Sequence, residues 1–176
     1  TSLSQCRSDI PLPQTTANQV RIIGGTWRRR VIRFPPTEGL RPTPDRVRET
    51  LFNWLGQTLV RKRCLDLYAG SGALTLEAAS RGAALAVAVD RSRVLIDALR
   101  ATAATLGASA FEAYVGDARA FIERERRDFD VIFLDPPFAA PVLPELCRRI
   151  EAGGWLRGGG LVYLEAPAAA GAPELP

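Results

Sequence analysis

The chain has 176 residues, of which 47% are hydrophobic and 24% are charged, a composition typical of one globular domain with a substantial core. It contains no histidine, which excludes His-based catalytic triads, H-E-x-x-H metal sites and imidazole acid–base catalysis. The apolar runs are far shorter than the ~20 residues of a membrane span, and the first twenty residues lack a signal-peptide pattern. We therefore expect a cytoplasmic protein with no membrane partner.

The sulfur-containing residues indicate no site. Cys6, Cys64 and Cys147 are widely spaced and form no C-x-x-C pair, so we expect neither a disulfide framework nor a bound metal. There is no methionine, not even at the first position, which indicates a processed or incomplete N-terminus.

The net charge of +4 is unevenly distributed. Residues 21–63 contain eleven basic and three acidic residues, so the rest of the chain is mildly acidic. This pattern predicts a polyanionic partner held by one end of the molecule. Decoration of the surface by an arginine-rich proteome is the alternative. The strongest candidates for binding are flanked by the aromatic residues Trp27 and Phe34, which suit bases as well as phosphates: Arg28, Arg29 and Arg30.

The first third of the chain reads as a tail followed by a basic extension. Residues 1–19 are polar and without periodicity, and we expect them to be disordered. Residues 20–34 alternate around a Gly-Gly break and predict a short hairpin. Thr43 is expected to cap a helix that begins at Pro44. Its apolar face is predicted to contain Val47, Leu51, either Trp54 or Leu55, and Leu59.

From residue 63 onward, short apolar runs alternate with helical patterns, and we treat residues 20–62 as an extension that packs on this core. We expect strands at 64–68, 85–90, 111–115, 130–135 and 161–165, and helices at 72–81, 92–106, 118–125 and 142–152. Strands so uniformly apolar do not face water. The sequence therefore predicts an α/β fold, a doubly wound, Rossmann-like, mostly parallel sheet with helices on both faces.

In such a sheet, ligands bind at the carboxyl ends of the strands. The run Ala69-Gly70-Ser71-Gly72 follows the first strand and permits a tight turn before a helix N-terminus. Asp90 ends the second strand, where a carboxylate can accept the hydroxyls of a ribose, although capping a helix is its more common role. Asp117 follows the third strand and has the same two interpretations, and Asp135 follows the fourth.

Two kinds of cofactor compete for this edge. A dinucleotide is disfavoured because the G-x-G-x-x-G fingerprint lacks its third glycine, where Thr75 stands. A ring of carboxylates suits instead a cofactor that has a ribose and carries positive charge, and S-adenosylmethionine, with its sulfonium and ammonium groups, meets this description. The expected cofactor-binding residues are Asp66, Ala69, Gly70, Ser71, Gly72, Asp90, Arg91, Asp117, Ala118 and Asp135.

The segment Asp135-Pro136-Pro137-Phe138 is the most specific candidate for catalysis. Prolines fix the backbone, so this corner would aim the Asp135 carboxylate and the Pro136 carbonyl at one point, beside Phe138 as a stacking plate. Two acceptors could hold both protons of an exocyclic amine and direct its lone pair at a methyl group, while the ring stacks on a base turned out of its helix. A turn that merely ends the strand is the alternative.

These motifs resemble those of class I S-adenosylmethionine-dependent methyltransferases that act on exocyclic nitrogens. More narrowly, RIIGGTWRRR, GLRPTPDRVRETLFNWL, CLDLYAGSGALTLEAASRGA and DPPF are similar to the bacterial 16S ribosomal RNA guanine-N2 methyltransferases called the RsmD family. The match runs from about residue 20 to 165. The family continues into a C-terminal antiparallel hairpin that the sequence, ending at Pro176, does not contain. This leaves open whether the core is complete.

The resemblance implies roles for individual residues. Gly70, Ser71 and Gly72 would contact the methionine part of the cofactor, Asp90 the ribose and Asp117 the adenine. Asp135 and Phe138 would serve the guanine. The residues expected to face the RNA are Arg28, Arg29, Arg30, Arg41, Thr43, Arg46 and Arg48.

The expected function is methyl transfer from S-adenosylmethionine to the N2 amine of a guanine in 16S ribosomal RNA, by in-line displacement and without a metal. The expected partner is the RNA within an assembled or assembling small subunit, bound by a monomer. An adenine-N6 DNA methyltransferase is one alternative, since a D-P-P-aromatic corner serves any exocyclic amine. A non-catalytic RNA-binding or ribosome-assembly factor on the same fold is the other.

Overall fold

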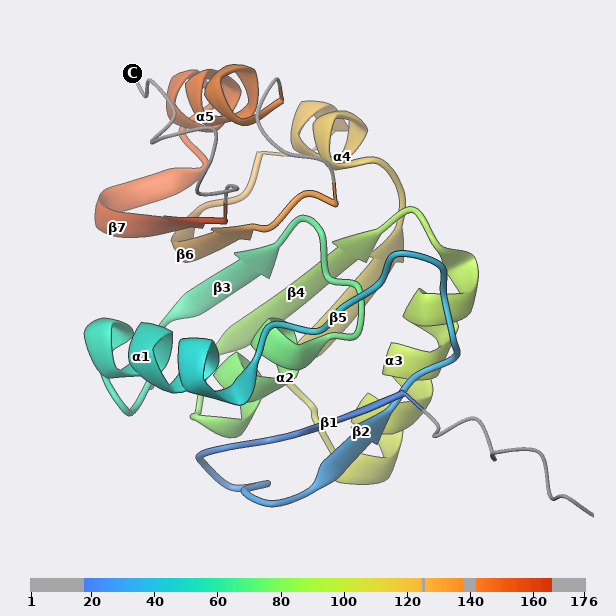
Figure 1. The fold of residues 1–176 in the computed structure, drawn as a ribbon. Coiled ribbons are helices and arrows are strands. Elements are labelled where there is room, and N and C mark those ends of the chain that lie inside the picture. The colour runs from blue at the N-terminus through green and yellow to red at the C-terminus, as the bar shows by residue number, and fades with distance from the viewer. Residues whose placement is uncertain (1–17, 125, 138–141, 166–176) are drawn as a thin grey trace, which may run out of the picture.

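A five-stranded parallel sheet with strand order β5-β4-β3-β6-β7 forms the centre of the protein (Figure 1). This computed structural model describes residues 18–124, 126–137 and 142–165. The strands are β3 (Arg63–Asp66), β4 (Leu85–Asp90), β5 (Phe111–Val115), β6 (Phe129–Leu134) and β7 (Leu156–Leu164). Because the chain adds β4 and β5 on one side of β3 and then β6 and β7 on the other, strand order reverses between β3 and β6.

Helices cover both faces of the sheet, and the predicted α/β architecture is confirmed. The helices α4 (Ala118–Arg124) and α5 (Leu143–Ala152) pack on one face. The other face carries α1 (Asp45–Leu55), α2 (Ala73–Ser80) and α3 (Arg93–Leu106). Beside α2 and α3 lies the predicted antiparallel hairpin, formed by β1 (Gln19–Arg21) and β2 (Val31–Arg33) (Figure 1).

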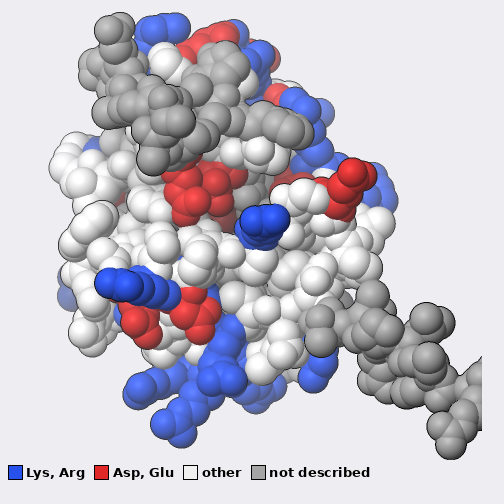
Figure 2. All heavy atoms as spheres, in the orientation of Figure 1, with Lys and Arg blue, Asp and Glu red and all other residues white. Residues whose placement is uncertain are grey.

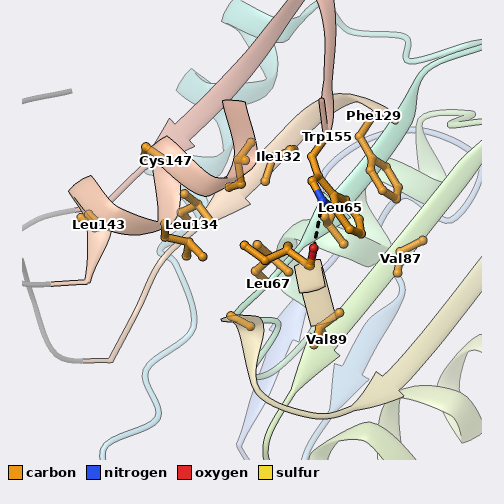
Figure 3. Close-up of a cluster of buried hydrophobic side chains, with 14 residues drawn as sticks. Leu65, Leu67, Val87, Val89, Phe129, Ile132, Leu134, Leu143, Cys147 and Trp155 are labelled. Carbon is orange, nitrogen blue, oxygen red and sulfur yellow. Dashed lines mark hydrogen bonds between the residues drawn. The ribbon is translucent and has the colours of Figure 1, made fainter. Parts of the chain in front are cut away.

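The face under α4 and α5 is built around Trp155 (Figure 3). Its indole stacks on the ring of Phe129 with 6.1 Å between centroids and an interplanar angle of 2°, and its Nε1 donates to the carbonyl of Ile122 at 3.1 Å. Leu65 and Ile132, which are partners in the β3–β6 register, point into this cluster. Since side chains alternate along a strand, Asp66 and Phe133 face the opposite layer, under α1 and α2.

The helix α1 departs from its sequence pattern. It begins at Asp45 after an N-cap at Pro44, and no side chain caps it, so the cap predicted at Thr43 is wrong. Leu51 is buried as predicted, and Leu55, the predicted alternative to the exposed Trp54, packs against the same cluster. Leu59 is buried beyond the end of the helix, but Val47 is 40% exposed. The buried face contains Arg48 and Phe52 instead, because a charged partner elsewhere in the fold compensates the arginine.

That partner is Glu77 of α2, whose fully buried carboxylate accepts hydrogen bonds from three parts of the chain. Arg48 Nη1 donates to it at 3.3 Å and Arg81 Nε at 2.8 Å. The backbone amides of Ile23 and Gly24, in the loop after β1, donate at 2.8 Å each. One buried carboxylate therefore fastens both the hairpin and α1 to the core.

Arg48 fastens the segment before α1 in the same way. Its guanidinium, which is 0% exposed, donates to the backbone carbonyls of Arg21 at 2.9 Å and of Thr43 at 3.1 Å. Asp45 supplies a second carboxylate, at 2.5 Å.

In the part of the chain that the structure describes, no helix is long and apolar enough to cross a membrane.

We expect Arg48→Met to destabilise the protein by about 3 kcal/mol, because the buried charge of Glu77 would keep only one of its two cations, Arg81, and the carbonyls of Arg21 and Thr43 would lose their donor. Urea unfolding at neutral pH measures the change. Arg46→Met is the matched control, since Arg46 is exposed on the same helix and should shift stability by less than about 0.5 kcal/mol. Equal unfolding midpoints for the two variants would contradict the structural role of Arg48.

Candidate active site

The glycine turn after β3 lies at the carboxyl end of the sheet. Gly70 and Gly72 adopt positive φ angles of 51° and 77°. A side chain at Gly72 would stand 2.0 Å from Leu99 Cδ2, and one at Gly70 would stand 2.8 Å from Leu40 Cδ1. Only glycine fits both the backbone conformation and the space. The amide of Gly72 donates to the carbonyl of Ala69 at 2.7 Å and closes the turn in front of α2.

Asp90 joins this turn to the end of β4. Its Oδ2 accepts from the backbone amide of Gly70 at 2.9 Å, and its Oδ1 accepts from that of Ser92 at 2.8 Å. Ser92 in turn caps α3, so the capping role considered for Asp90 belongs to its neighbour. The carboxylate is held at the edge with its remaining lone pairs available.

Asp66 lies two residues further inside the sheet, since it pairs with Ala88 rather than with Asp90. It is 2% exposed and accepts from Thr75 Oγ1 at 2.9 Å and from the amide of Tyr68 at 3.3 Å. Burial is the main cause that raises the pKa of Asp66 to about 7, and the carboxylates of Asp135 and Asp90 add to the increase. Thr75, which replaces the third glycine of a dinucleotide fingerprint, thus supports this carboxyl group.

Asp117 caps α4, as its structural interpretation predicted. Its Oδ1 accepts from the amides of Arg119 at 2.9 Å and Ala120 at 3.2 Å, while its Oδ2 pairs with the exposed Arg91. The hydrogen bond from Arg91 is the main cause that lowers the pKa of Asp117. A cavity of about 250 Å³ along β5 and α4 reaches this loop and is lined by Tyr114, Val115, Gly116, Asp117, Ala120, Phe121, Arg124 and Arg127.

Asp135, Pro136 and Pro137 follow β6 directly at the same edge, and Phe138 lies outside the described residues. Burial, which is the largest cause, and the neighbouring Glu165 together raise the pKa of Asp135 to about 7. A carboxyl group that takes up a proton near neutral pH suits a role in proton transfer.

Glu165 is the site residue that the sequence interpretation missed. Its amide donates to the carbonyl of Leu134 at 3.0 Å, which continues the β6–β7 ladder and places it beside Asp135. Tyr163 donates its hydroxyl proton to Glu165 Oε1 at 2.7 Å. The signal was present, because Glu165 ends the fifth strand as Asp90 and Asp135 end the second and fourth.

The structure thus brings one carboxyl group from each of four adjacent strands to one edge and one face: Asp90, Asp66, Asp135 and Glu165. Figure 2 shows acidic atoms near the centre of this view, where β3, β6 and β7 end in Figure 1. Within the described ranges, no group of three potential ligands is arranged to hold a metal ion. The arrangement suits a ligand that is itself positively charged.

The predicted RNA-facing arginines separate into two groups. Arg28, Arg29 and Arg30 are exposed in the turn between β1 and β2. This turn is bound to the end of α2, where Thr26 donates to the carbonyl of Ser80 at 2.7 Å. Figure 1 places it at the lower left, away from the carboxyl ends of the strands, and Figure 2 shows basic side chains along that margin. Arg41 and Arg46 are also exposed.

Thr43 and Arg48 are 7% and 0% exposed, and the interactions of Arg48 are those of a structural residue. We therefore assign neither residue a direct contact with a substrate. They position the segment that carries Arg41 and Arg46.

We expect Asp66→Asn to stabilise the protein at pH 8 by roughly 3 kcal/mol and much less at pH 5. The pKa of Asp66 is raised by folding, so the wild type loses stability as pH rises towards 7, and an amide does not ionise. Urea unfolding at both pH values measures this, with Asp97→Asn on the exposed side of α3 as control. A gain that is equal at pH 5 and pH 8 would contradict the raised pKa.

Comparison with known proteins gives a consistent picture. The family described as "Conserved hypothetical protein 95" matches residues 20–176. The "Ribosomal RNA small subunit methyltransferase D" of Escherichia coli K12 is 43% identical over 160 residues, which cover 91% of this chain and 81% of the relative. The solved structure of "Putative methyltransferase yhhF" from Escherichia coli is 41% identical with a TM-score of 0.84, and the alignment covers 90% of this chain and 87% of that one.

A more distant solved structure contains the product of the expected cofactor. It is the Trypanosoma brucei PRMT1 enzyme-prozyme complex with AdoHcy, 27% identical with a TM-score of 0.55 over 67% of this chain and 38% of that one. On the match of nearly the whole chain, this protein belongs to the family described as Conserved hypothetical protein 95, the RsmD family of class I methyltransferases.

Proposed function

We propose that this protein transfers a methyl group from S-adenosylmethionine to the exocyclic N2 of a guanine in 16S ribosomal RNA. The observation that carries the proposal is the row of carboxyl groups beside a glycine turn on the switch-point edge of the sheet. The 43% identity to a small-subunit ribosomal RNA methyltransferase supports the choice of RNA. We propose that it acts as a monomer in the cytoplasm on an assembled or assembling small subunit.

The residues present fit the cofactor. The glycine turn would lie against the methionine part, with Ala69, Ser71 and the backbone of Gly70 and Gly72 as its wall. Asp90, already oriented by the amides of Gly70 and Ser92, would accept the ribose hydroxyls. The bound group supplies an activated methyl on a sulfonium, and the buried carboxyl of Asp66 contributes negative potential behind it.

For the adenine we propose the loop that contains Asp117 and Ala118. The Asp117 carboxylate is occupied by the α4 amides and by Arg91, so it holds the loop in shape rather than offering a free acceptor. Arg91 itself, with a side chain that is 80% exposed, is placed to close the edge of this part of the site.

For the target amine, Asp135 and the Pro136 carbonyl would accept its two N–H groups and direct the nitrogen lone pair at the methyl group. Phe138 would stack on the base. Pro136 and Pro137 hold the corner rigid, since both residues have a fixed φ. Positioning and electrostatic stabilisation then supply most of the rate.

The basic residues suggest how the RNA lies. We propose that residues 20–62 form an RNA-binding extension and that residues 63–176 form the methyltransferase core. Arg41 and Arg46 would contact phosphates near the target base, and Arg28, Arg29 and Arg30 would contact phosphates towards the opposite edge of the sheet. The RNA would then extend along the face that carries α1, α2 and the hairpin.

We expect the protein to transfer labelled methyl groups from S-adenosylmethionine to small ribosomal subunits that lack the modification, with N2-methylguanine as the product on mass spectrometry. Asp135→Ala should lower the single-turnover rate by at least ~100-fold with little change in cofactor affinity. Glu151→Ala, on the exposed side of α5, is the matched control. Label appearing in duplex DNA instead would contradict the proposal, and so would wild-type rates for Asp135→Ala.

The RNA-binding role of the extension is tested by its salt dependence. We expect the double variant Arg28→Gln/Arg30→Gln to reduce the slope of log affinity against log salt by about 1.5, because each lost phosphate contact removes ~0.7 to 0.9 from the slope. Arg29 is left unchanged so that the position of the turn with a φ of 71° is not altered. Arg126→Gln/Arg148→Gln changes two exposed arginines outside the extension and should leave the slope unaltered. Equal slopes for both double variants would argue against phosphate contacts in the hairpin turn.

A further inference from the structure

Asp135 and Glu165 lie side by side at the carboxyl ends of β6 and β7. The β6–β7 register aligns Leu134 with Leu164, so the residues that follow are the next pair on the same ladder. The 3.0 Å bond from the Glu165 amide to the Leu134 carbonyl fixes this alignment. Neighbouring strands are about 4.8 Å apart, so the side chains of Asp135 and Glu165 leave the same face of the sheet next to each other.

Two carboxyl groups in such contact do not both ionise freely. They share a proton, and the pair binds it more tightly than an isolated carboxylate would. Among the described residues, the titratable groups that act on the pair are Tyr163 on β7 and Asp66 on β3, and neither is cationic. The two carboxyl groups therefore take up one proton readily, and they release it only at a higher pH than an isolated carboxyl group would.

We propose that Glu165 is a positioning residue for methyl transfer, which makes Asp135 a proton acceptor by sharing with it the proton that leaves the target amine. The proposal rests on the proposed function and adds a residue to the same site. Tyr163 supports the role, because its hydroxyl donates to Glu165 Oε1 at 2.7 Å and orients that carboxyl group towards Asp135.

The step balances. The lone pair of the amino nitrogen forms the N–CH₃ bond, and the S–CH₃ bond breaks with its electron pair on sulfur, which becomes a neutral thioether. The nitrogen then carries one positive charge and loses a proton to the Asp135 carboxylate, which leaves a neutral methylated amine. The pair passes from two negative charges to one as it holds the proton between Asp135 and Glu165, and later releases that proton to solvent.

The charge of Glu165 should be visible in the pH dependence of the reaction. Burial and Glu165 together raise the pKa of Asp135 to about 7, and the rate requires its ionised form, so the wild-type rate should fall below about pH 7. In Glu165→Gln the neighbouring charge is absent. We expect the midpoint of the acid limb of the single-turnover rate to move down by roughly 1 to 2 pH units.

Because a weaker base accepts the proton less readily, the same variant should be about tenfold slower at pH 8. Glu165→Asp, which keeps the charge, should retain an acid limb near that of the wild type. Glu151→Gln makes the same chemical change at an exposed position of α5 and should leave the profile unchanged.

Tyr163→Phe provides a test in the opposite direction. Loss of the hydroxyl donor destabilises the ionised form of Glu165, so the pair should hold its proton more tightly and the acid limb should move to higher pH. A merely structural role for either residue would lower the rate without moving the midpoint. Unchanged midpoints in both Glu165→Gln and Tyr163→Phe would overturn the proposal.

A second measurement separates this proposal from the proposed function. Titration of the Asp135 side-chain carboxyl carbon by NMR, assigned with Asp135→Asn, needs no RNA. We expect its pKa to fall by roughly 1 to 2 units in Glu165→Gln. If the wild type methylates no RNA while this shift is observed, the proposed function fails and the coupling stands. If RNA is methylated and no shift is observed, the coupling fails.

Discussion

The candidate site depends on a parallel sheet that holds several carboxyl groups at one edge. Among the described residues, no ion pair joins Asp66, Asp90 or Asp135 to an arginine or lysine side chain. Like charges so close together are unfavourable, and each group meets this cost differently. Asp90 accepts hydrogen bonds from two backbone amides, and Asp66 accepts them from a hydroxyl and an amide and has a pKa of about 7. Burial and the neighbouring Glu165 raise the pKa of Asp135 to about 7 as well. A cationic ligand at this edge would relieve the repulsion, so the electrostatics of this edge favour the ligand that the proposed chemistry needs.

A buried carboxylate also attaches the extension, residues 20–62, to the core. A single carboxylate, Glu77, receives two guanidinium groups and two amides, and three of these four donors come from residues 20–62. The extension is therefore fixed by desolvated interactions, which a change of ionic strength screens weakly. No ion pair between described residues involves the exposed arginines of the extension, whereas Arg48 is fully engaged.

Much of the fold follows from alternation of short apolar runs with helical segments, and the strands 85–90 and 111–115 have the predicted boundaries. The face of α1 did not follow, because periodicity treats arginine as polar and the carboxylate that compensates Arg48 lies 29 residues further along the chain. Long-range ion pairs of this kind leave no local pattern.

The candidate site likewise contains residues that the sequence pattern revealed and one, Glu165, that it did not. Glycines and acids that follow strands were recognisable because their position relative to the strand carries the signal. Glu165 follows that rule, yet no short motif surrounds it, and its pairing with Asp135 depends on the register of β6 with β7, which sequence alone does not determine.

The contact of Leu40 with Gly70 has a consequence for protein engineering. The leucine belongs to the extension and the glycine to the core, and there is no space for a methyl group between them. A chimera that replaced residues 20–62 with those of a relative would keep a well-formed turn only if the incoming side chain at position 40 matched the shape of that backbone. Because position 70 is restricted to glycine, position 40 is the side of this contact that an exchange of the extension would have to match.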